Sequence, residues 1–251
     1  MLRAVPVPTA GPEEIAMKRS EVNAIMREAD AFFAKQGFYL PPFAHWSPED
    51  WTKKGPEVGE IVDRRLGWDI TDFGRNDFCS CGITLFTIRN GPPEDLARGK
   101  GKLYCEKILM FRRDQRCPYH FHWLKMEDII NRGGGELVVE VCNAASNETL
   151  ADTPVTLSLD GVSRTVDAGT GLRLQPGESA SLPPYCYHQI TGRHDRVMVG
   201  EVSLVNDDDH DNRFLEKVGR FPDIEEDEKP LFLLRQDYAR YYPLFDPASR
   251  R

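Results

Sequence analysis

Short β-type segments recur at short spacing along the chain after about Gly82. Each combines β-branched, aliphatic or aromatic residues over the length of one strand, and most are bounded by glycine, proline or asparagine. Seven segments have this pattern: ITLFTIRNG, LYCEKILMFRR, ELVVEVCNA, VTLSLDG, LRLQPG, SASLPP and VMVGEVSLV. No β-α-β alternation accompanies them, so we expect a closed barrel or a double-sheet β architecture.

The part of the chain before these strands has helical periodicity. We predict a helix with Ser20 as its N-cap and Gly37 at its end, because the apolar residues between them fall on one face. These residues are Val22, Ile25, Met26, Ala29, Phe32 and Phe33. Ser47 is predicted to begin a short capped turn, followed by a charged helical stretch to about Arg65.

The length of 251 residues suits one domain. We predict a single domain over residues 17–240, with a helical subregion at about 17–80 and a β-barrel at about 81–240. Residues 1–16 are rich in proline and lack an apolar period, so they are predicted to form a loose arm. Residues 241–251 are predicted to form a tail.

The composition excludes several classes of partner. The formal net charge is -8 and the pI is near 5.3, whereas binding to nucleic acid or to anionic membranes requires clustered lysine and arginine. The sequence has no long apolar run and no signal-peptide pattern, so we expect a soluble, cytoplasmic protein. The six cysteines match neither a dense disulfide framework nor a zinc ribbon and are expected to be reduced.

Four residues have the spacing of a metal site. His120 and His122 are two residues apart, which on a strand puts both imidazoles on one face, roughly 7 Å apart along the chain. Glu127 follows at an interval that lets the chain return in the neighbouring strand, and the glycines at 133–135 would permit a tight turn. His188 comes later, after a Pro-Gly turn. Three imidazoles and one carboxylate leave open positions on a six-coordinate metal, as catalysis requires.

The two segments that carry these residues resemble the paired motifs of the cupin superfamily. The matching residues are His120, His122, Glu127 and Gly134 in the first motif, and Gly177, Pro183 and His188 in the second. Two turn positions depart from the motifs, since Asp114 and Tyr185 replace glycines. The resemblance implies a mainly β fold, a cupin-type double-stranded β-helix or jelly-roll barrel, with the N-terminal helices packed outside.

Longer stretches are similar to the D-lyxose isomerase family, from Met17 to about Tyr238. They include LGWDITDFG, GITLFTIRNG, HFHWLKMEDIINRGGG and GEVSLVNDDDHDNRF. The resemblance implies a manganese-dependent aldose–ketose isomerase that interconverts D-lyxose and D-xylulose, often with activity on D-mannose and D-fructose. Co²⁺, Fe²⁺ and Zn²⁺ remain alternatives to Mn²⁺.

Such a reaction needs a group that shuttles a proton between two sugar carbons. We favour Glu201, because it begins the last apolar strand and inward alternation would point it toward the metal. Lys125 and Lys107 could each polarise a sugar oxygen or donate a proton. For all three residues, a solvent-facing position is the alternative.

Five further residues are candidates for substrate binding. Trp46, Phe121 and Trp123 could form apolar walls against a sugar, with ordinary core packing as the alternative. Asp211 and Arg213, in the DDDHDNRF segment, could bind sugar hydroxyls, with a solvated loop as the alternative.

Two other functions remain open on the sequence. The ligand set does not choose the metal, so an Fe(II) or Cu(II) cupin dioxygenase is one alternative. A non-catalytic, metal-containing sugar-binding protein is the other. The expected partners are a small neutral sugar and a second copy of the chain, because homodimers are common among soluble enzymes.

Overall fold

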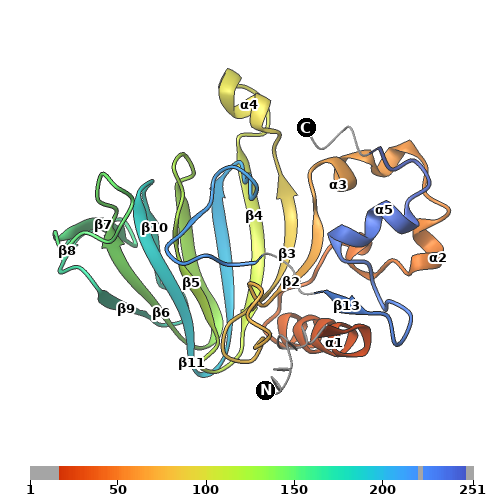
Figure 1. Ribbon diagram of the computed structural model, residues 1–251, viewed down its shortest axis with the longest axis horizontal. Coiled ribbons are helices and arrows are strands. Elements are labelled where there is room, and N and C mark those ends of the chain that lie inside the picture. Colours follow the sequence, from red (N-terminus) through yellow and green to blue (C-terminus); the bar gives the residue numbers. More distant parts are fainter. Residues whose placement is uncertain (1–16, 220–222, 247–251) are drawn as a thin grey trace, which may run out of the picture.

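The protein consists of a curved barrel of antiparallel strands with helices packed against one side (Figure 1). The computed structural model describes residues 17–219 and 223–246. The predicted arm at 1–16 and the end of the predicted tail, 247–251, lie outside the described residues. Within the described ranges, no helix combines the length and the apolar composition that a membrane span requires. All six cysteines are free thiols, as expected.

Eleven strands form the barrel sheet. They are β2 (Gly67–Thr71), β3 (Ile83–Asn90), β4 (Tyr104–Phe111), β5 (Arg116–Phe121), β6 (Glu127–Asn143), β7 (Val155–Leu159), β8 (Val162–Val166), β9 (Thr170–Leu174), β10 (Ser179–Leu182), β11 (Cys186–Leu204) and β12 (Arg213–Phe214). Two short strands, β1 (Met17–Lys18) and β13 (Ile224–Glu225), pair separately in parallel. All seven predicted segments form strands, and the mainly β prediction is confirmed.

The two longest strands connect the two halves of the barrel. β11 pairs with β5 along its first half, with β4 along its second half, and with β6 along nearly its whole length. β6 in turn pairs with β10 near its start and with β9 near its end. Two of the predicted strand segments are therefore only parts of longer strands that cross the molecule.

The tight turn expected at 133–135 is wrong, because β6 continues through these glycines. Gly133 and Gly134 have φ values of +148° and +92°, and the register of β6 with β11 shifts beside them. A Cβ atom on Gly134 would lie 2.1 Å from the carbonyl oxygen of Arg196. Glycine is required here by the close approach of two strands and by the positive φ.

Helices lie outside the barrel, on the side of β2 and β3 (Figure 1). They are α1 (Arg19–Lys35), α2 (Pro48–Trp51), α3 (Gly59–Asp63) and α5 (Tyr238–Tyr241), with α4 (Pro93–Arg98) in a loop and three short 3-10 turns, η1 (Pro42–His45), η2 (Pro56–Val58) and η3 (Arg235–Asp237). The predicted apolar face of α1 is buried against the sheet. Ser20 is not its N-cap, because the helix begins at Arg19 and the Ser20 hydroxyl donates to Asp227 instead.

Strand β2 directs its alternate side chains to two different environments. Trp68 and Ile70 pack in the layer beneath α1, whereas Asp69 and Thr71 face the barrel cavity. This strand lies within the segment predicted as helical, and its side chains contribute polar groups to the interior of the barrel.

An ion-pair network ties α1 to the C-terminal part of the chain. Arg19 is 1% exposed and forms two 3.0 Å hydrogen bonds to Asp237 and two more to Glu226. We expect Arg19→Ala to lower the free energy of unfolding by about 3–5 kcal/mol, because Asp237 stays buried without its counter-charge. Chemical denaturation measures this loss. Arg240→Ala is the control, since Arg240 is exposed and lies 3.7 Å from Glu226; a loss as large in this variant would contradict the prediction.

Candidate active site

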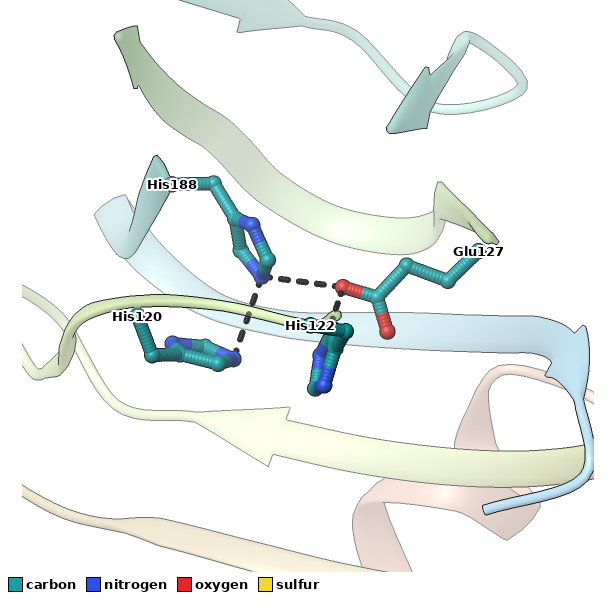
Figure 2. A group of neighbouring side chains, drawn as sticks. All are labelled: His120, His122, Glu127 and His188. Atoms are coloured by element: carbon teal, nitrogen blue, oxygen red, sulfur yellow. Dashed lines mark hydrogen bonds and ion pairs between the residues drawn. The ribbon is translucent and has the colours of Figure 1, made fainter. Parts of the chain in front are cut away.

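Four side chains converge inside the barrel, and Figure 2 shows them pointing toward one centre. His120 lies on β5 and His122 directly after it, Glu127 begins β6, and His188 lies near the start of β11. All four are buried, and one ligand atom of each lies within 4.8 Å of the others. The expectation that Glu127 returns in the strand next to β5 is wrong, because β11 pairs with both β5 and β6 and lies between them.

The four donor atoms form a compact group. His188 Nε2 lies 3.1 Å from His120 Nε2 and 2.9 Å from Glu127 Oε1. His122 Nε2 lies 3.5 Å from the same carboxylate oxygen. Strand register accounts for part of this convergence, because His188 lies directly opposite His120.

Backbone carbonyls orient all three imidazoles. The Nδ1 atoms of His120 and His188 lie 2.9 and 3.0 Å from carbonyl oxygens two residues earlier in their own segments. His122 Nδ1 lies 2.5 Å from the carbonyl oxygen of Asp211. Because a carbonyl oxygen only accepts, each Nδ1 must carry the hydrogen, and each Nε2 then presents its lone pair to the centre.

The chemistry of the donor set fits a divalent metal ion. His122 Nε2 is buried without a hydrogen-bond partner within the part of the chain that the structure describes. Burial lowers the pKa of His120 and His122, which favours the neutral, metal-binding form. Burial alone would raise the pKa of Glu127, but the ammonium group of Lys125 holds it well below its ordinary value. The group could therefore hold a metal with neutral nitrogen ligands and one anionic oxygen ligand.

The three residues predicted as catalytic lie together beside these ligands. Lys107 Nζ and Lys125 Nζ each lie 2.9 Å from Glu201 Oε1, and Lys125 Nζ also lies 2.7 Å from Glu127 Oε2. Glu201 on β11 lies opposite Lys107 on β4. All three are buried, so the solvent-facing alternative does not apply to them.

The charges in this group are mutually stabilised. Burial alone would raise the pKa of Glu201, but the ammonium groups of Lys107 and Lys125 outweigh it and leave the pKa below its ordinary value. Burial alone would lower the pKa of either lysine, but the pKa of Lys107 is raised chiefly by Glu201 and that of Lys125 by Glu127 and Glu201. Glu201 is therefore an ionised carboxylate at neutral pH and can accept a proton.

A cavity of about 320 Å³ connects these groups. Its volume is at the lower end of the range for small-molecule sites. Three of the four metal-ligand candidates line part of its wall, and His188 lies behind them. The wall also includes both lysines, Glu201 and apolar residues such as Leu109 and Phe214. Arg235, which also lines the cavity, lies 2.5 Å from Asp69 and 2.8 Å from Asp208.

Sequence reasoning missed Asp69 and Arg235. The alternation of β2 could have indicated Asp69, because the large apolar residues Trp68 and Ile70 flank it. Nothing in the local pattern around Arg235 marks it, since it follows the apolar stretch LFLL in the C-terminal part of the chain.

The three aromatic substrate-binding candidates lie away from the cavity wall. Phe121 and Trp123 alternate with the two histidines and point to the opposite face of β5, where they pack with Tyr187 and neighbouring residues. Trp46 packs against Phe43 and Trp51 among the helices. Core packing accounts for all three positions.

The two polar candidates also lie outside the cavity wall. The Asp211 carboxylate accepts hydrogen bonds from the backbone amides of Leu124 and Lys125. Arg213 Nε donates to Glu148 at 2.8 Å, on the outer side of β5. Neither side chain lines this cavity, and both are held by other groups of the protein.

The barrel, with its buried cluster of three histidines and one glutamate, defines a cupin-type protein with a candidate metal site. Solved structures of L-ribose isomerases share this fold. The enzyme from Cellulomonas parahominis with L-ribose has a TM-score of 0.55 and 17% identity, covering 84% of this chain and 100% of that chain. The enzyme from Geodermatophilus obscurus has a TM-score of 0.54 and 15% identity, covering 84% and 99%. The predicted fold class is confirmed.

A model of the D-lyxose isomerase family matches residues 17–238. A D-lyxose/D-mannose isomerase from Serratia proteamaculans is 51% identical over 228 residues, covering 90% of this chain and 99% of the relative. One from Escherichia coli O157:H7 is 48% identical over 229 residues, covering 90% and 100%. The chain belongs to the D-lyxose isomerase family and is a sugar isomerase, so the dioxygenase and non-catalytic alternatives are set aside.

Proposed function

We propose that this enzyme interconverts D-lyxose with D-xylulose, and D-mannose with D-fructose. The two relatives named D-lyxose/D-mannose isomerase support the choice of sugars. The observation that carries the proposed reaction is the chain of contacts from Glu201 through Lys125 to Glu127, which joins an ionised carboxylate to the metal-ligand cluster inside one cavity.

In this proposal, Glu201 moves the proton. In the aldose-to-ketose direction it takes the proton from C2, the C2–H electrons form the C1–C2 double bond, and the electrons of the C1 carbonyl bond move onto the C1 oxygen. Glu201 then returns its proton to C1, while the proton of the C2 hydroxyl passes to the C1 oxygen and leaves the ketone at C2. Both lysines are hydrogen-bonded to Oε1 of Glu201 and neither to Oε2, which supports its orientation as a base.

Lys107 and Lys125 are proposed to stabilise charge on the sugar oxygens. Both ammonium groups are buried and held by carboxylates, so their positions are set before a substrate binds. A bound divalent cation would supply a Lewis acid for the two adjacent sugar oxygens. We propose Mn²⁺, held by His120, His122, Glu127 and His188, with Co²⁺, Fe²⁺ and Zn²⁺ as alternatives.

The cavity wall suggests which groups contact the rest of the sugar. We propose Asp69, Asp208 and Arg235 as hydrogen-bonding groups for sugar hydroxyls, and Phe214 as part of an apolar wall. The single domain at 17–240, the homodimer and the cytoplasmic location stay predictions.

Turnover of D-lyxose tests the function directly. We expect the Mn²⁺-loaded protein to convert D-lyxose to D-xylulose, and D-mannose to D-fructose, with product measured by chromatography. Removal of the metal with a chelator should abolish turnover and readdition of Mn²⁺ should restore it, because the Lewis acid is then supplied again. Absence of turnover on both sugars after loading with each of the four metals would contradict the proposal.

A further inference from the structure

Asp211 makes three hydrogen bonds to the segment that carries His122 and Lys125. It lies in the loop after β11 and is 7% exposed. Its Oδ1 accepts from the amide of Leu124 at 2.9 Å and its Oδ2 from the amide of Lys125 at 2.8 Å. Its own carbonyl oxygen accepts from His122 Nδ1 at 2.5 Å. One residue thus forms hydrogen bonds to three consecutive parts of this active-site segment: the His122 ring and the amides of Leu124 and Lys125.

His122 differs from His120 and His188 in the origin of the carbonyl oxygen that orients its ring. His120 and His188 find their carbonyl acceptors two residues away. His122 lies just beyond the end of β5, and its acceptor is 89 residues away in the sequence. The orientation of the His122 ring is therefore set by the position of another loop, and not by its own strand.

The Asp211 carboxylate also fixes the backbone position of Lys125. Its amide is bound to Asp211, and its ammonium group lies between Glu127 and Glu201 at 2.7 and 2.9 Å. A shift of the backbone at Lys125 would move the ammonium group relative to both carboxylates. Such shifts of about 1 Å can strongly reduce catalysis.

We propose that Asp211 is a positioning residue, which orients His122 toward the metal and Lys125 toward the reacting sugar. Its loop also contributes Asp208 and Asn212 to the cavity wall, so the proposal links the substrate side of the site to the metal side. The part that concerns Lys125 rests on the proposed function. The part that concerns His122 predicts metal affinity alone and can be tested without a sugar.

The test compares two variants of Asp211 by titration of the metal-free protein with Mn²⁺. Asp211→Ala removes both carboxylate acceptors, which keep the Asp211 carbonyl in place against His122 by binding the amides of Leu124 and Lys125. Asp211→Asn keeps the size and one acceptor oxygen. We expect the Kd for Mn²⁺ to rise about 10–100-fold in Asp211→Ala, and less in Asp211→Asn, as for other groups that orient metal ligands. Saturating Mn²⁺ should restore occupancy but not kcat, because Lys125 remains displaced.

Asp207 provides the matched control. It lies in the same loop, and its carboxylate accepts from the amides of Asp209 and His210 within that loop. We expect Asp207→Ala and Asp207→Asn to have a Kd for Mn²⁺ within about twofold of that of the unaltered protein, a change well below the effect expected for a group that orients a metal ligand.

If the Asp211 variants fold and bind Mn²⁺ normally, or if the Asp207 variants lose as much affinity, the proposal is overturned. Should Asp211→Ala fail to fold, Asp211→Asn decides the question. A protein inactive on every sugar would refute the proposed function, whereas the Mn²⁺ titration would still test the role of Asp211 in orienting His122.

Discussion

Glu201→Gln is expected to lower kcat by about 10²–10⁴-fold, the range typical of a general base, while Mn²⁺ still binds. The amide has nearly the same shape as the carboxylate but cannot take the proton from the sugar. Its oxygen can still accept from Lys107 and Lys125, which lie 2.9 Å from Oε1 in the unaltered protein. Steady-state kinetics on D-lyxose, together with a metal titration, measures the two effects separately.

Glu106→Gln is the control for this prediction. Glu106 lies on β4 next to Lys107 in the sequence, but its side chain is partly exposed and lies 3.0 Å from Arg89. We expect turnover in this variant to remain close to that of the unaltered enzyme. Retained activity in Glu201→Gln would contradict the assignment of the base and would direct attention to Lys125 or Lys107.

His188→Ala is expected to lose metal and activity together. His188 Nε2 lies 3.1 Å from His120 Nε2 and 2.9 Å from Glu127 Oε1. Its removal therefore takes away the ligand atom that contacts both of these candidates. We expect the Kd for Mn²⁺ to rise by more than about 100-fold, which exceeds the effect of removing a residue that only orients a ligand. Metal content after gel filtration, and the rise of Tm on adding Mn²⁺, measure this loss.

His210→Ala serves as the comparison for the loss of an imidazole. His210 is exposed, and its ring contacts the carboxylate of Asp207 in the same loop. It should keep both the metal and the Tm response. Stoichiometric metal in His188→Ala would show that this histidine is not a ligand. His188→Ala and Glu201→Gln together separate metal binding from proton transfer.

The metal-ligand candidates could be predicted from sequence because their directions depend on local geometry. Two histidines separated by one residue on a strand face the same side, and the structure has both rings in the cavity. The same period of two puts Phe121 and Trp123 on the opposite face of the strand. The prediction that they contact the substrate did not take this alternation into account. The face of α1 was predictable for the equivalent reason, since a period of 3.6 depends only on the helix itself.

The roles of the glycines and the long strands could not be predicted in this way. Gly134 suggests a turn when its sequence is considered alone, whereas the structure uses it where β6 passes close to Arg196. Each segment of β6 and β11 was recognisable as a strand, but their continuity became visible only when their partners were known. A partner strand contributes hydrogen bonds and steric limits that the local sequence does not contain.

By itself, the sequence determined the β-rich architecture, the apolar face of the first helix, the four candidate ligands and the family resemblance. Only the tertiary structure brought Asp69 and Arg235 to the cavity and turned Asp211 from a candidate sugar ligand into a support for His122 and Lys125. The physical reason is that side-chain direction follows from the period of a helix or strand. Contacts between segments about 90 residues apart, such as that of Asp211 with His122, depend on strand register and the packing of the whole chain.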